Sequence, residues 1–120
     1  MNLEKFTERS RGFIQAAQTI AMRESHQRLA PEHLLKAMMD DDQGLASNLI
    51  SRAGGEPARV TEALAIAMTK LPKVSGDAQP FMDPGLAKAL DEAEKLAKKA
   101  GDSCVPVESV LMVLGMMPSK

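Results

Sequence analysis

Residues 31–39 decide the fold class, and they read Pro31-Glu32-His33-Leu34-Leu35-Lys36-Ala37-Met38-Met39. Proline stands at a first-turn position of a helix, where its missing N–H is not needed. The apolar side chains that follow share one face at helical spacing: Leu34, Leu35, Met38 and Met39. The stretch therefore predicts an amphipathic helix that begins at Pro31 and ends before the acidic run Asp40 to Asp42.

The same pattern recurs 76 positions later in the chain. Glu32 aligns with Glu108, and Leu35 aligns with Leu111. The preceding helix repeats as well, because Ala17 and Ala21 align with Ala93 and Ala97 and the helix cap Thr7 aligns with Asp83. The agreement of caps, apolar stripe and loop length predicts the duplication of a four-helix unit.

Six helical segments and no strand are predicted, so the fold class is all-α, a duplicated four-helix domain with pseudo-twofold repeats. The first helix opens at the cap Thr7, and Gly54 and Gly101 are expected to stop the third and the fifth. The segments cover residues 7–24, 31–39, a short stretch around 45–50, 57–71, 84–100, and a last one from about 106.

The predicted organisation is a first repeat over residues 1–72, a linker over 73–82 and a second repeat over 83–120. Pro, Gly, Ser and Asp without periodicity mark the linker. Only two helices follow the linker, so we expect the second repeat to be truncated. Helices five and six would then expose apolar surface that favours self-association.

Composition and charge exclude several classes of partner. The net charge is -1, which gives no electrostatic attraction for nucleic acid or for an anionic membrane. The chain has no Trp, no Tyr and three Phe, so it lacks the rings on which bases stack. Cys104 is the only cysteine, which fits a reducing compartment. With no secretory signal and no membrane-spanning apolar run, we predict a cytoplasmic protein.

The sequence also offers no catalytic or cofactor motif. There is no P-loop, and no serine stands in a nucleophile elbow. His26 and His33 have no further ligands at zinc-like spacing, and Asp40 to Asp42 lack the alternation of a calcium loop. We therefore predict no enzymatic activity, no cofactor and no metal for this chain, and a half-buried packing or hydrogen-bonding role for His33.

Four short motifs, in their order along the chain, resemble those of Clp N-terminal domains. They are Phe6-Thr7-Glu8-Arg9, Ala30-Pro31-Glu32-His33-Leu34-Leu35, Leu71-Pro72-Lys73-Val74, and Ala100-Gly101-Asp102 followed by Glu108. The Leu-Pro-x-Val linker is closer to ClpB-type disaggregases than to the protease-partner relatives ClpA and ClpC. The resemblance covers the chain up to about Leu114, and residues 115–120 fit it poorly.

The resemblance implies a substrate-engaging N-domain, joined by a flexible linker to two ATPase modules of a homohexameric ring. Such a domain captures exposed apolar segments of unfolded or aggregated polypeptides. Positions that match the family's substrate groove are Thr7, Asp102 and Glu108 as a polar trio and Leu90 as an apolar lining residue. Ser109 departs from the usual apolar residue. ATP and Mg²⁺ would belong to the absent modules, and the isolated chain would be monomeric or weakly self-associating.

Each polar position of the trio also has a structural interpretation. Thr7 is a helix cap, Asp102 follows Gly101 at a helix end, and Glu108 lies in a first turn where a carboxylate favours the helix dipole. Two other functions stay open. An adaptor-docking module of the ClpA or ClpC type would ignore generic unfolded chains, and a small helical enzyme or regulator would need a convergent polar site, which the sequence does not offer.

Overall fold

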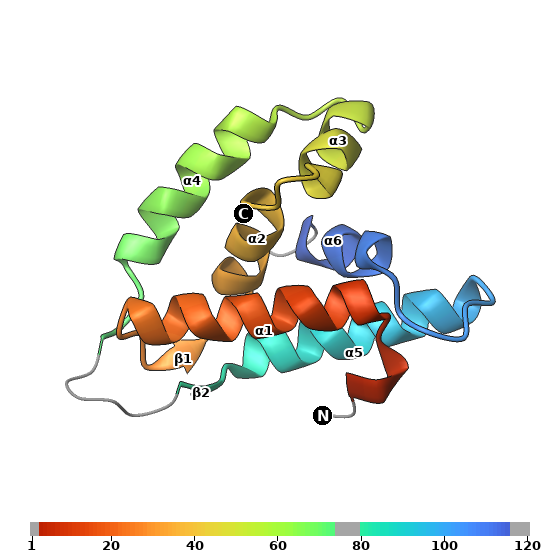
Figure 1. Ribbon diagram of the computed structural model, residues 1–120, viewed down its shortest axis with the longest axis horizontal. Coiled ribbons are helices and arrows are strands. Elements are labelled where there is room, and N and C mark those ends of the chain that lie inside the picture. Colours follow the sequence, from red (N-terminus) through yellow and green to blue (C-terminus); the bar gives the residue numbers. More distant parts are fainter. Residues whose placement is uncertain (1–2, 74–79, 116–120) are drawn as a thin grey trace.

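A computed structural model describes residues 3–73 and 80–115, and it confirms the six predicted helical segments (Figure 1). A short 3-10 helix, η1, precedes them. The elements are η1 Leu3–Lys5, α1 Glu8–Arg23, β1 Arg28–Leu29, α2 Pro31–Met39, α3 Leu45–Arg52, α4 Pro57–Thr69, β2 Phe81–Met82, α5 Pro84–Lys99 and α6 Val107–Gly115.

The helix ends follow the predicted signals. The side chain of Thr7 accepts a hydrogen bond from the amide of Ser10, and the side chain of Asp83 accepts one from the amide of Gly85. Both bonds satisfy amide groups that the first turn of a helix leaves without a partner. Gly54 and Gly101 have φ angles of 91° and 86°, so each supplies the left-handed residue that ends a helix.

The prediction of no strand is wrong. β1 and β2 pair in parallel, with Arg28 opposite Phe81 and Leu29 opposite Met82. A strand of two residues shows no alternation of polar and apolar side chains, so sequence periodicity cannot reveal it. The pairing places β2 at the end of the segment predicted as a linker, whose residues 74–79 lie outside the described part of the chain.

The duplication is visible in the backbone. α1 and α5 both have 16 residues, α2 and α6 both have nine, and each pair is offset by 76 positions. The pairing of Leu29 with Met82 has an equivalent at the same offset, because Phe6 pairs in parallel with Val105. We call these two contacts the Leu29 joint (residues 25–33, 72–73 and 80–83) and the Val105 joint (residues 5–10 and 102–109).

The two joints tie the repeats together through equivalent hydrogen bonds. At the Leu29 joint the amide of Asp83 donates to the carbonyl of Leu29 over 3.0 Å. At the Val105 joint the amide of Thr7 donates to the carbonyl of Val105, also over 3.0 Å. The predicted truncation of the second repeat concerns the chain after α6 and stays a prediction.

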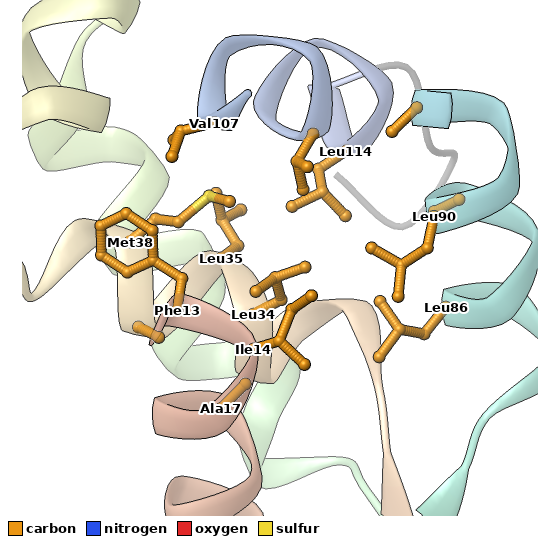
Figure 2. Close-up of a cluster of buried hydrophobic side chains, with 14 of the residues drawn as sticks. Phe13, Ile14, Ala17, Leu34, Leu35, Met38, Leu86, Leu90, Val107 and Leu114 are labelled. Atoms are coloured by element: carbon orange, nitrogen blue, oxygen red, sulfur yellow. The ribbon is translucent and has the colours of Figure 1, made fainter. Parts of the chain in front are cut away.

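The core lies between the repeats and is built by α1, α2, α5 and α6 (Figure 2). Figure 2 shows Ile14 of α1 and Leu34 of α2 pointing toward Leu86 and Leu90 of α5, with Leu114 of α6 above them. α1 buries one apolar face against this core, where Phe13, Ala17, Ile20 and Ala21 are all buried, and Phe6 just before the helix is buried as well. α3 and α4 pack on α2 and add the buried side chains of Ala46 and Leu64 to this core (Figure 1).

Candidate functional site

The Val105 joint fixes the start of α1 against the loop between α5 and α6. The carbonyl of Val105 accepts from the amide of Thr7 and from Oγ of Ser10, each over 3.0 Å. The amide of Val105 donates to the carbonyl of Lys5 over 2.6 Å. Ser10 is itself buried, so its hydroxyl is a structural group of this joint rather than a surface one.

Thr7 has a structural role that uses most of its side chain. Its Oγ1 accepts from the amide of Ser10 over 3.2 Å and lies 3.0 Å from Oγ of Ser10. Since Oγ of Ser10 donates to the Val105 carbonyl, the hydroxyl of Thr7 donates to Ser10. One acceptor site remains on Thr7, which is partly exposed. The cap interpretation of Thr7 is confirmed, and a ligand has only this acceptor to use.

Asp102 and Glu108 stand on either side of Val105, and both are exposed. The amide of Asp102 donates to the carbonyl of Ala97 over 2.9 Å, which closes the end of α5. Glu108 lies in the first turn of α6, where the partial positive charge of the helix start favours a carboxylate. Thr7 bonds the carbonyl of Val105, and Asp102 and Glu108 lie within three residues of Val105 along the chain, so the three predicted polar positions all belong to the Val105 joint.

Leu90 does not belong to this surface. Its side chain is 0% exposed and lies in the core with Leu86 and Leu114 (Figure 2). α6 packs on α5 and covers this position. A ligand could reach Leu90 only if the two helices separated, so in the structure Leu90 is a core residue.

The sequence interpretation missed a groove along the outer face of α1. It has a volume of about 680 Å³ and runs between α1 and the end of α2. Gly12 and Ala16 leave the surface of α1 low, and Arg9 bonds Asp41 across the groove over 2.8 Å. The small residues four positions apart on α1 were the available signal, but their spacing equally fits an ordinary solvent-facing helix.

The second repeat has Ser109 where the first has His33, and this difference changes the joint. His33 is 0% exposed, so the prediction that it is half-buried is wrong. Its Nε2 lies 2.6 Å from Nδ1 of His26, and its Nδ1 accepts from the amide of Ala30 over 2.9 Å. Burial, as the largest cause, lowers the pKa of His26 below its ordinary value and that of His33 to about 4.

Within residues 3–73 and 80–115, no three His, Cys, Asp or Glu side chains come together in a way that would hold a metal ion. None of the helices in these ranges combines the length and the apolar composition that crossing a membrane requires.

Comparison with known proteins supplies a family for this fold. Residues 5–118 match the model of the Clp repeat (R) N-terminal domain. Chaperone protein ClpB of Rhodopseudomonas palustris is 52% identical over 118 residues, which are 97% of this chain and 13% of that protein. This chain thus spans about one eighth of the length of the ClpB relative.

Two solved domains share the fold. The Hsp104 N-terminal domain from Candida albicans superposes with a TM-score of 0.79 at 22% identity, over 92% of this chain and 73% of that one. A ClpV N-domain in complex with a VipB peptide superposes with a TM-score of 0.76 at 19% identity, over 94% and 71% of the two chains.

Proposed function

Since the chain belongs to the Clp repeat (R) N-terminal domain family, we propose that it engages exposed apolar segments of unfolded or aggregated polypeptides. The ClpB relative supports this assignment at 52% identity. In a parent protein of the ClpB type, the domain would deliver these segments to a hexameric ATPase ring. The ring, its ATP and its Mg²⁺ belong to the part of such a protein that this chain does not span.

The observation that carries the proposal is the exposed surface of the Val105 joint. Asp102 and Glu108 are exposed on the chain that flanks Val105, whose carbonyl accepts from the amide of Thr7, and Arg9 of the following turn lines the groove of about 680 Å³. An extended polypeptide presents backbone N–H groups, and carboxylates can accept hydrogen bonds from them. Its apolar side chains would lie over the low face formed by Gly12 and Ala16.

The expected binding is weak and tolerant of sequence. Burial of apolar surface contributes about 25 cal/mol per Å², and this term does not depend on which apolar side chain is buried. Bonds from Asp102 and Glu108 to a backbone are equally independent of sequence. An open groove without a deep pocket gives no shape selection, which suits a domain that meets many substrates.

The test is binding to an unfolded model protein, measured by fluorescence anisotropy with labelled, reduced and carboxymethylated lactalbumin. Native lactalbumin is the folded comparison. We expect selective binding of the unfolded form, weakened about fivefold to tenfold by Asp102→Ala or Glu108→Ala because each removes one charged hydrogen-bond acceptor. Equal binding of the two forms of lactalbumin would overturn the proposal.

Matched controls separate contact from stability. Glu92→Ala removes an exposed carboxylate of α5 that pairs with Lys95 over 3.7 Å, so it should leave the affinity unchanged. Leu90→Ala should cost about 2–5 kcal/mol of stability, as for other core leucines, with no direct loss of a ligand contact. If Glu92→Ala weakens binding as much as Glu108→Ala, the effect is one of net charge.

Docking of a single adaptor is the second candidate. The solved complex of a ClpV N-domain with a VipB peptide favours it, because that domain holds one defined peptide. The same experiment distinguishes the two functions. A folded, helical chain that ignores unfolded lactalbumin would favour adaptor docking.

A further inference from the structure

The buried histidine pair lies where the first repeat meets the second. His26 is 2% exposed and His33 is 0% exposed. The segment that carries His26 is bonded on both sides by the chain that joins the repeats: the amide of Gln27 donates to the carbonyl of Pro72, and the amide of Phe81 donates to the carbonyl of Gln27. Both histidines therefore belong to the segment that the Leu29 joint holds in place.

The hydrogen bonds of the pair run in one direction only. The amide of Ala30 can only donate, so Nδ1 of His33 must accept and the proton of His33 lies on Nε2. Nε2 then donates to Nδ1 of His26 over 2.6 Å. A proton added to His33 would take the acceptor from Ala30, and one added to Nδ1 of His26 would set two donors against each other. Either event breaks a bond in a buried site.

The pair is close to solvent on one side. A cavity of about 290 Å³ reaches His26 between α1, α2 and the end of α4. The charged groups that face it are Arg23 and Glu24 from the end of α1, Lys36 from α2 and Lys73 from the chain after α4, while α4 contributes Ala65, Met68 and Thr69. Glu24 favours a proton on either ring, and Lys73 opposes one on His26.

We propose that His26 and His33 form an acid-sensitive latch, whose protonation releases the segment between α1 and α2 and opens the β1–β2 pairing between the repeats. The Val105 joint has no such device. At the positions equivalent to His26 and His33 it carries Asp102 and Ser109, so it contains no imidazole. Acid should therefore loosen one joint and spare the other.

The direction of the pH dependence follows from the lowered pKa values. Between about pH 4 and the ordinary histidine value of 6.5, the unfolded chain binds protons that the folded chain does not. Stability is therefore complete above pH 6.5, and it falls as the pH is lowered through this range. When the pH is lowered from 7.5 to 5.5, protonation of His33 in the unfolded chain alone raises the unfolding equilibrium constant about tenfold. The chain contains two histidines, and both belong to this pair.

The first measurement is amide hydrogen exchange by NMR at pH 7.5 and pH 5.5, corrected for intrinsic rates. The amides of Asp83 and Thr7 form an internal comparison, because they make equivalent bonds at the two joints. We expect Asp83 to lose protection at pH 5.5 by at least threefold more than Thr7. Equal loss at both joints, or no loss at either, would overturn the latch.

The matched variant is His33→Gln. Gln at this third helix position can accept from the amide of the cap residue, and its amide group can still donate to His26, but it does not titrate. The variant should lose most of the tenfold pH effect and keep Asp83 protected at pH 5.5. If the variant fails to fold, the proposal can still be tested by NMR titration of the two imidazole rings in the wild-type chain. A histidine ring that is protonated above pH 6.5 in the folded state would also overturn the proposal.

Discussion

At the residue scale, the ends of α1 and α5 use different residues for the same backbone conformation. Ser25 has a φ angle of 58°, and its equivalent Gly101 has one of 86°. A side chain in this left-handed region carries about 1 kcal/mol of strain. We expect Ser25→Gly to raise the free energy of unfolding by about 0.5 kcal/mol, the remainder being lost to the flexibility of glycine. Gly101→Ser should lower it by about 1 kcal/mol, although a Cβ there meets no atom within 4 Å. Urea unfolding followed by circular dichroism measures both, and a destabilised Ser25→Gly chain would contradict the prediction.

At the element scale, α4 depends on one buried side chain. Leu64 is the buried residue of this helix, and Figure 1 shows α4 at the outer edge of the molecule. Leu64→Ala should cost about 2–3 kcal/mol and should raise amide exchange in α4 more than in α1, because local opening follows the number of buried contacts. Ile66→Ala is the control, because Ile66 is 55% exposed and its substitution should change the free energy of unfolding by no more than about 0.5 kcal/mol. Equal loss of protection in α1 and α4 would show that α4 does not open by itself.

At the scale of the whole molecule, the apolar stripe of α5 is covered. Leu86, Ala89, Leu90, Ala93 and Ala97 are all buried, and Met112 is the large apolar side chain that α5 and α6 leave exposed in the described part of the chain. The surface expected to drive self-association is therefore small, and we predict a monomer near 12.9 kDa in sedimentation equilibrium at about 100 μM. A dimer would contradict this prediction, and its dissociation by Met112→Lys would assign the dimer interface to α6.

The sequence by itself determined the helices and their order. Periodicity, caps and stop signals act over one or two helical turns. Helix ends could therefore be predicted without the rest of the fold, as they were at Thr7, Pro31, Asp83 and Gly101. The offset of 76 positions, read from the sequence, reappeared in the lengths of both pairs of helices.

Only the tertiary structure revealed the joints, the groove and the burial of Leu90 and His33. Phe6 meets Val105 and Leu29 meets Met82 across long stretches of chain, and pairings this short leave no periodic trace. Leu90 reads as any apolar residue of an amphipathic helix, and only the packing of α6 on α5 makes it a core residue rather than a lining residue. The burial of His33 likewise depends on what α1 and α4 place around it. Helix formation depends on residues that are neighbours in the sequence, whereas burial depends on contacts that form only when distant segments of the chain meet.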